Sequence, residues 1–308
     1  MPHLHESKIK FLEEMANQIR EDVIEMVAGA GSGHLGGPLG MADIFAALYF
    51  HILRHDPKNP EWPERDRLIL SNGHICPVRY AAMARAGYFP VEELKTLRRL
   101  GTRLQGHPHR TALPGVETTS GPLGSGLSQA VGAAIAARMD PVRGKSPVAT
   151  AASMARASNG VDKRKISIYC LMSDGEQECG QTWEAAMLAG KLRLDNLTAL
   201  VDRNNIQIDG MTEDIMPLEP LRAKYEAFNW HVIEINGHNF EEIVQAYETA
   251  QSVYEKPVLI LAHTIPGKGV DFMEFNYLWH SKAFKPGEAD EALRQLNAAE
   301  GKIKSEHE

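Results

Sequence analysis

Two short apolar runs in this chain each end in residues whose side chains carry oxygen ligands. The run 166–172 leads into Asp174, and the run 197–201 leads to Asn204, with a helix-like segment between them. This order predicts a strand–helix–strand unit, and the carboxyl ends of parallel strands face one ligand crevice. Asp174, the Asn204 amide oxygen and the Ile206 carbonyl suit a hard divalent cation that keeps positions for water and phosphate oxygens. The segment therefore predicts a site for a diphosphate and Mg²⁺, or Ca²⁺ or Mn²⁺ in its place.

Four histidines, His34, His74, His107 and His280, lie in segments that we expect to be loops. Imidazole donates and accepts hydrogen bonds and moves protons near neutral pH, which suits chemistry on a molecule with several hydroxyl groups. Any one of them, taken alone, could be a structural loop residue. The other histidines lie near the termini, at a helix end or beside a strand, and we expect them to be structural.

The composition limits the class of protein. The chain has 308 residues, 43% of them hydrophobic and 24% charged, which is enough for one large α/β domain with a substantial core. The net charge of −7 argues against a nucleic-acid-binding surface. Three cysteines without paired or metal-ligand spacing fit a reducing compartment. No apolar run is long enough to span a membrane, and the first residues lack a signal-peptide pattern, so we expect a cytoplasmic protein.

Alternation of apolar runs with helical periodicity predicts an α/β domain with a doubly wound, mainly parallel sheet and helices on both faces. Strands are expected at 67–71, 166–172, 198–202, 231–235 and 257–263, and helices at 7–28, 41–53, 75–86, 91–100, 124–139 and 240–253. Ser7 is expected to cap the first helix and Gly29 to end it. We expect residues 1–308 to form a single domain. A surface insertion is expected at about 140–165 and a charged, helical C-terminal tail at about 287–308.

Asp174-Gly175, followed by Asn204 thirty positions later, resembles the thiamine diphosphate signature. Five further motifs resemble those of transketolases and occur in the same order: Ser32-Gly33-His34, Ser71-Asn72-Gly73-His74, Gly106-His107-Pro108, Gly121-Pro122-Leu123-Gly124 and Trp279-His280. The resemblance covers about residues 7–285 and matches only the first half of a transketolase, which binds the cofactor's diphosphate. The chain is thus similar to the N-terminal subunit of a split transketolase.

The resemblance implies roles for individual residues. His34, His107 and His280 are implied to be catalytic, with His34 and His280 at the reactive carbon and donor carbonyl and His107 at the substrate hydroxyls. The implied cofactor-binding residues are His74, Gly121, Leu123, Asp174, Gly175, Glu184 and Asn204. The implied metal ligands are Asp174, Asn204 and the carbonyl of Ile206. The implied reaction is transfer of a two-carbon ketol unit from a ketose to an aldose, with the cofactor supplying the carbanion chemistry.

One position departs from the family pattern. Transketolases usually have Glu immediately before the glycine that corresponds to Gly180, and this chain has Cys179 there, with Glu178 one place earlier. Glu184, further along the same helix, does match. In the family the missing glutamate helps to link two active sites through buried carboxylates. Cys179 puts that link in doubt.

The resemblance also implies a partner, because the pyrimidine-binding domain is absent from this chain. We therefore expect the chain alone to be inactive and to need a C-terminal transketolase subunit, in an α₂β₂ assembly. Pentose phosphates are the default substrates, and a specialised enzyme for a sulfosugar or a branched-sugar phosphate is an alternative. Two other hypotheses stay open: the α-type subunit of a 2-oxo acid dehydrogenase, and a non-catalytic scaffold subunit that binds the cofactor.

Overall fold

The computed structural model describes residues 4–139 and 166–306. The insertion that we expected at about 140–165 lies outside these residues. Within the described ranges, no helix is both long and apolar enough to cross a membrane.

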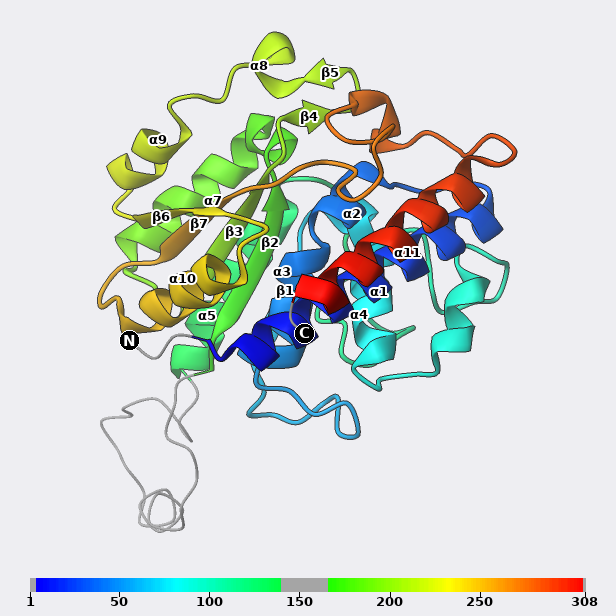
Figure 1. Ribbon diagram of the computed structural model, residues 1–308. Helices are drawn as coiled ribbons and strands as arrows, with labels where there is room; N and C mark the ends of the chain where they lie inside the picture. Colours follow the sequence, from blue (N-terminus) through cyan, green and yellow to red (C-terminus); the bar gives the residue numbers. More distant parts are fainter. Residues whose placement is uncertain (1–3, 140–165, 307–308) are drawn as a thin grey trace.

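Five parallel strands form the central sheet, in the order β1-β2-β3-β7-β6 (Figure 1). Their bounds are Arg67–Leu70 (β1), Ile168–Ser173 (β2), Leu197–Arg203 (β3), His231–Asn236 (β6) and Val258–His263 (β7). The inner strands β2, β3 and β7 are buried along almost their whole length, as expected when helices cover both faces of a parallel sheet. All five expected strands are present, each within two residues of its expected bounds.

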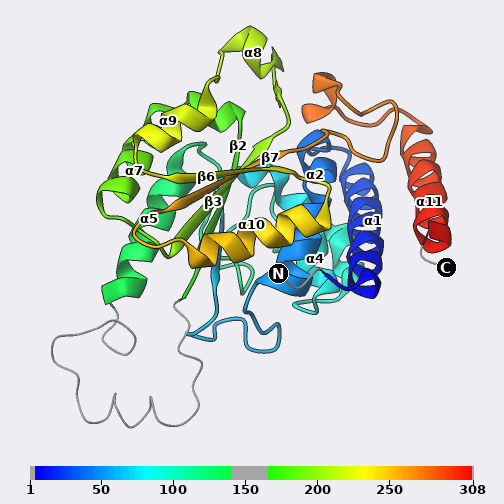
Figure 2. The ribbon, with the colours of Figure 1, turned by 60° about the vertical axis from the view of Figure 1, so that its left-hand side comes forward.

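Helices cover both faces of the sheet (Figure 2). One face packs against α1 (Glu6–Ala30), α3 (Ala42–Ala47), α4 (Cys76–Arg85) and α10 (Phe240–Ser252) in the larger of two hydrophobic clusters. The other face packs against α5 (Ser125–Met139), α7 (Gly180–Lys191) and α9 (Leu221–Ala227) in the smaller cluster. Successive strand residues belong to alternate clusters, as Ile69 and Leu70 do. The expected doubly wound α/β architecture is confirmed.

The shorter elements lie mostly in the connections. They are α2 (Gly36–Gly40), a π-helical turn (Leu48–Ile52), 3₁₀ turns at Gly73–Ile75, Val91–Thr96, Gly175–Glu178 and Tyr277–His280, the β4–β5 hairpin (Ile206–Gln207 and Gly210–Met211), and α8 (Thr212–Ile215). Three of these turns and the β4 strand carry residues that we expected at the site.

Three local predictions were wrong. The first helix is capped by His5, whose ring accepts a hydrogen bond from the Ser7 amide at 3.3 Å, and Ser7 is not the cap. That helix continues through Gly29 and ends at Ala30, and the next residue, Gly31, adopts a left-handed φ of 66°. The helix expected at 91–100 is only the 3₁₀ turn Val91–Thr96, because Arg98 takes a left-handed φ of 59° and turns the chain.

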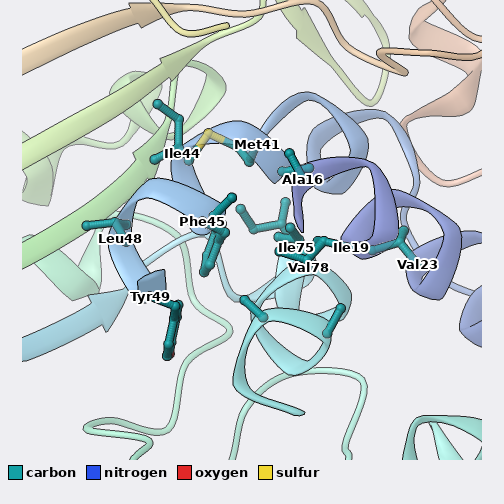
Figure 3. Close-up of a cluster of buried hydrophobic side chains, with 14 of the residues drawn as sticks. Ala16, Ile19, Val23, Met41, Ile44, Phe45, Leu48, Tyr49, Ile75 and Val78 are labelled. Atoms are coloured by element: carbon teal, nitrogen blue, oxygen red, sulfur yellow. The ribbon is translucent and has the colours of Figure 1, made fainter. Parts of the chain in front are cut away.

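The core beneath the histidine loops is built from α1, α3 and α4 (Figure 3). Ala16, Ile19 and Val23 repeat at helical spacing along α1, and all three are fully buried. They pack with Phe45 of α3 and with the segment that starts at Ile75, directly after His74. The loop that carries His74 therefore rests on a close-packed floor.

The C-terminal helix α11 (Glu288–Glu306) lies along α1 (Figure 1). Its Ala292 and Leu296 are fully buried, and the Leu296 carbonyl accepts a hydrogen bond from Asn17 Nδ2 at 3.2 Å. Leu296 also packs against Gly269, where an added Cβ would lie only 2.8 Å from it. This segment is thus an amphipathic helix that completes the core around α1.

Replacing Leu296 with Ala should lower the free energy of unfolding by about 2–4 kcal/mol, because it leaves a cavity between α11 and α1. Urea denaturation measures the change. Asn297→Ala, at an exposed position on the same helix, is the matched control and should change stability by less than about 0.5 kcal/mol. Equal stability of the two variants would show that α11 does not belong to the cooperative fold.

Candidate active site

The carboxyl ends of β1, β2 and β3 lie level with one another, which brings distant parts of the sequence together. Ser173 at the end of β2 is in register with Asp202 of β3, and the Asp174 amide donates to the Asp202 carbonyl at 3.2 Å. Beside them, β1 leads into Ser71 and the turn Gly73–Ile75 that carries His74. The two strand ends that we expected to form a crevice therefore do so.

A cavity of about 400 Å³ opens at these strand ends. Nine of the eleven residues selected from the sequence line it: His34, Gly121, Leu123, His74, His107, Gly175, Asn204, Ile206 and His280. Asp174 is fully buried next to the lining residue Gly175. Glu184 is exposed on α7 and does not line the cavity. Its cofactor-binding role stays a prediction.

Three of the four histidines form a triangle on one side of the cavity. The ring centroids of His34 and His74 are 4.9 Å apart, those of His34 and His280 are 5.3 Å apart, and those of His74 and His280 are 5.1 Å apart. The rings come from three separate connections, the first and last of which are more than 200 residues apart in sequence. His107 lines the same cavity from a fourth segment.

Burial keeps these imidazoles neutral. It lowers the pKa of His34 to about 3, and the neighbouring His280, Arg98 and His107 act in the same direction. Burial is also the main cause of the lowered pKa of His74, His107 and His280. Near neutral pH the cluster therefore offers uncharged donors and acceptors, which can hydrogen-bond to a carbonyl or hydroxyl and exchange a proton with it.

Two buried carboxylates, Asp174 and Asp202, belong to the same site. Burial raises the pKa of Asp174 to about 6, although Arg203 donates to Asp174 Oδ2 at 3.2 Å and the Asn205 amide donates to the same oxygen at 2.6 Å. Burial also raises the pKa of Asp202 to about 7, and the Asp174 charge adds to that increase. The negative charge of Asp174 and Asp202 is thus incompletely neutralised by the surrounding protein, and this favours a bound cation.

The donor chemistry fits a hard cation. Asp174 supplies a carboxylate, Asn204 an amide oxygen and Ile206 a main-chain carbonyl, which are the ligands that Mg²⁺ and Ca²⁺ prefer. Asn204 is held by two hydrogen bonds: its Nδ2 donates to Asp202 at 2.8 Å, and its Oδ1 accepts from the Ile206 amide at 3.0 Å. The described residues contain no metal-holding group of three or more His, Cys, Asp or Glu side chains. The expected ligand set of Asp174, Asn204 and the Ile206 carbonyl contains only one such side chain. The absence of a group of three therefore does not argue against this ligand set.

A polar ligand would also give a partner to a group that now lacks one. His34 lines the cavity, and its Nδ1 is buried without a hydrogen-bond partner among the described residues. Gly37 lines the cavity, and a Cβ there would lie 2.9 Å from Ile75, so only glycine leaves this close approach open. Polar donors, oxygen ligands and an uncovered backbone together fit an anionic cofactor bound through a cation.

Sequence reasoning missed Glu176, which organises the site. Its buried Oε1 accepts hydrogen bonds from the Ser71 hydroxyl and from the Gly124 amide at 2.5 Å, and its Oε2 accepts from the Ser173 amide at 3.3 Å. One carboxylate thus joins the loops that carry His74, Leu123 and Asp174. Burial raises its pKa to about 6, and the three donors act against that increase. Its place two residues after Asp174 was the only signal in the sequence.

Cys179, the position that departs from the family pattern, lies beside the Gly124 loop. It is partly exposed, and its Cβ lies 2.8 Å from the position that a Cβ on Gly124 would occupy. Glu178 is exposed at the cavity wall and does not supply a buried carboxylate at that position. Glu176, three residues before Cys179, is a buried carboxylate, and its charge adds to the effect of burial in raising the pKa of Cys179.

Asp202 is a second functional candidate that the sequence reasoning did not select. It lines the cavity, and its carboxylate accepts hydrogen bonds from the Thr264 hydroxyl and from Asn204. Its position at the end of the β3 run, two residues before Asn204, could have identified it.

Comparison with known proteins identifies the family to which this site belongs. The family model for the thiamine diphosphate binding domain of transketolase matches residues 12–301. The chain therefore belongs to the transketolase family.

Among its relatives, the 6-deoxy-6-sulfo-D-fructose transketolase subunit SqwG of Clostridium sp. (strain MSTE9) is 46% identical over 270 residues, which are 88% of this chain and 90% of that protein. An apulose-4-phosphate transketolase subunit of Phocaeicola vulgatus is 36% identical over 300 residues, which are 97% and 99% of the two chains. The solved transketolase from Leishmania mexicana superimposes with a TM-score of 0.81 at 32% identity. The alignment covers 96% of this chain but only 45% of the Leishmania mexicana transketolase. The chain thus matches the split subunits over most of their length and less than half of this longer transketolase.

Replacing His34 with Asn should make the fold less sensitive to acid. The unfolded chain binds a proton on this ring as the pH falls through about 6.5, and the folded chain does so only near pH 3, so the wild type loses stability below about pH 6.5. Between pH 7.5 and 5.5 the wild type should lose about 1 kcal/mol more than the variant. Urea denaturation at both pH values tests this. His109→Asn, at an exposed position, should behave like the wild type.

Replacing Glu176 with Ala should destabilise the fold by about 3 kcal/mol at pH 7.5, because it leaves buried donors without their acceptor. It should also weaken binding of thiamine diphosphate with Mg²⁺ at least tenfold, measured by calorimetry, because the three loops lose their common anchor. Glu176→Gln keeps an oxygen at this position and should lie between Ala and wild type. Unchanged binding by the Ala variant would show that the loops hold their positions without Glu176.

Proposed function

We propose that this chain is the diphosphate-binding subunit of a two-chain transketolase, which transfers a two-carbon ketol unit from a ketose to an aldose. One observation carries the proposal: neutral histidines and a set of buried oxygen ligands belong to a single cavity. The match to split transketolase subunits over nearly their full length supports the same assignment.

We assign cofactor binding and substrate binding to two different sets of residues in the cavity. Asp174, Asn204 and the Ile206 carbonyl would hold a divalent cation and, through it, the diphosphate of thiamine diphosphate, with Gly175 beside them. When bound, the cofactor supplies the carbanion chemistry that cleaves and forms the carbon–carbon bond. Gly121 would allow the main chain to approach it closely, and Leu123 would pack against its ring.

The histidines would handle the substrate. Because His34 and His280 are neutral and their rings lie 5.3 Å apart, each can donate an N–H hydrogen bond to a carbonyl oxygen and stabilise the negative charge that develops there. His107, on a separate loop, would bind the hydroxyl groups of the sugar. His74 forms the third corner of the triangle and would contact the diphosphate.

A second polypeptide would complete the site, in an α₂β₂ assembly. Relatives of similar length carry the word subunit in their names. The part of the surface nearest the cavity also has features of an interface: Ile208, Phe275 and Leu278 come from the hairpin and the Tyr277–His280 region, and each is more than half exposed. A pyrimidine-domain subunit would cover these side chains and supply the remaining half of the cofactor site.

The proposed donor is a ketose with an anionic group, either a sulfosugar or a sugar phosphate. Names of two relatives specify 6-deoxy-6-sulfo-D-fructose and apulose 4-phosphate. These names favour the specialised enzyme over one dedicated to pentose phosphates. The family match favours ketol transfer over 2-oxo acid decarboxylation, and the neutral histidine cluster favours catalysis over a scaffold role.

The proposal is tested by measuring ketol transfer from a sugar phosphate or sulfosugar, with the chain purified alone or together with a co-expressed pyrimidine-domain protein. The complex should be active with thiamine diphosphate and Mg²⁺, and the chain alone should not. In the complex, His107→Ala should lower kcat/KM about 100-fold or more. The neighbouring exposed His109→Ala is the matched control and should keep wild-type activity. Release of CO₂ from a 2-oxo acid, or activity of the chain alone, would contradict the proposal.

A further inference from the structure

His238, in the turn after β6, does not line the cavity, yet both nitrogens of its ring are hydrogen-bonded. Its Nε2 accepts a hydrogen bond from the Ile265 amide at 2.8 Å, and its Nδ1 lies 2.6 Å from Asp43 Oδ2. A main-chain amide can only donate, so Nε2 carries no hydrogen and Nδ1 donates to the carboxylate. The ring is therefore neutral, and each nitrogen has one fixed partner.

A buried ion pair fixes the Asp43 end of this contact. Asp43 is buried on α3, and Arg20 of α1 pairs with it. Burial alone would raise the pKa of Asp43, but Arg20 and His238 outweigh burial and hold the pKa below its ordinary value. Arg20 also donates from Nε to the Leu39 carbonyl at 3.1 Å. The orientation of the His238 ring is thus set by two helices of the core.

The Ile265 end belongs to a segment that reaches the expected cation ligands. Directly before it, the Thr264 hydroxyl donates to Asp202. The same carboxylate accepts from Asn204 Nδ2 at 2.8 Å and so orients the Asn204 amide. Thr264 is buried, and it packs on Gly237, where an added Cβ would lie 2.5 Å from its Cγ2. A shift of this segment would therefore disturb the side chain that orients Asn204.

The same segment also supports α2, which begins two residues after His34. The Gly267 amide donates to the Gly36 carbonyl at 2.9 Å. At the other end of α2, a Cβ on Gly40 would lie 2.8 Å from the Ile265 carbonyl oxygen, so the two main chains are in close contact. The amide that His238 holds thus lies between the expected cation ligands and the turn that follows His34.

We propose that His238 is a positioning residue of the cofactor site: its hydrogen bond to the Ile265 amide keeps Asn204 and α2 in place to bind thiamine diphosphate with its cation. The argument rests on the proposed function and goes beyond it, since it assigns part of the cofactor affinity to a side chain outside the cavity. A role in stability alone would need only the Asp43 contact and the packing of the ring. The second hydrogen bond is directed at a segment that touches both parts of the site.

Two substitutions separate the hydrogen bonds of His238. His238→Asn places its amide near the position of Nδ1, so it keeps a donor for Asp43 and loses the acceptor for Ile265. His238→Gln reaches the position of Nε2, so it keeps an acceptor for Ile265 and loses the donor to Asp43. Each variant loses the ring and one hydrogen bond, so both should lower stability to a similar extent in urea denaturation. Their effects on the cofactor site should differ.

Hydrogen exchange measures the Ile265 contact directly in the purified full chain. Exchange of the Ile265 amide should be about tenfold faster in His238→Asn than in the wild type, and close to the wild type in His238→Gln. His231→Asn, at the exposed first residue of β6, is the matched control and should exchange like the wild type.

Calorimetry with the two-chain complex measures the consequence for the cofactor. In the presence of Mg²⁺, His238→Asn should raise the dissociation constant of thiamine diphosphate about tenfold, as loss of an outer contact to a ligand residue does. His238→Gln and His231→Asn should stay close to the wild type. At saturating cofactor, kcat for ketol transfer should change little in any of the three, because His238 does not line the cavity.

Thr264→Val tests the next contact along the same path. It keeps the shape of the side chain and removes the hydroxyl that donates to Asp202, so it should also weaken binding of thiamine diphosphate about tenfold. This variant replaces His238→Asn if the latter does not fold. Unchanged affinity in Thr264→Val would then overturn the proposal.

The outcomes also separate this inference from the function on which it rests. A wild-type complex that neither binds thiamine diphosphate nor transfers a ketol unit removes the proposed function, and the role of His238 with it. If the wild-type complex does both, unchanged affinity in His238→Asn removes only the role of His238. Equal losses of affinity in His238→Asn and His238→Gln would also overturn the proposal, since they would follow the loss of the ring and not the contact with Ile265.

Discussion

The arrangement of the cavity depends on one buried carboxylate. Glu176 accepts hydrogen bonds from Ser71 and Gly124, which belong to two different connections, and from Ser173 at the carboxyl end of β2. A parallel sheet brings strand ends level but does not by itself fix the loops that leave them. Glu176 supplies that constraint with side-chain oxygen, and it stays buried because polar donors surround it. The positions of His74, Leu123 and Asp174 follow from it.

The cavity separates two kinds of electrostatic environment within one small volume. Burial makes the histidines harder to protonate, and it makes Asp174 and Asp202 harder to ionise. Both effects come from the removal of water. The histidines and the carboxylates differ in what they can bind. Neutral rings suit the hydroxyl and carbonyl groups of a sugar, and crowded carboxylates suit a divalent cation. A cofactor that carries a diphosphate at one end and reacts at the other matches this division.

The sequence predicted the sheet well because buried parallel strands appear as continuous apolar runs, and β2, β3 and β7 are such runs. It predicted the gathering of the four loop histidines through motif order. It did not predict Glu176, because the partners Ser71 and Gly124 lie 105 and 52 residues away and only the fold brings them to it. The conformation of Arg98 was missed for the same kind of reason, since its turn is held by Leu104 and Ser32 and not by a local glycine. Roles that depend on long-range hydrogen bonds leave little trace in local sequence patterns.

Arg203 has a consequence for the chain without a metal ion. Its guanidinium contacts Asp174 and also reaches Thr212, Glu213 and Glu219, so a positive charge that belongs to the polypeptide already stands beside the buried carboxylate. The polypeptide thus carries its own counter-ion for a carboxylate that would otherwise be buried without one. The sheet can close around Asp174 without waiting for a cation from solution.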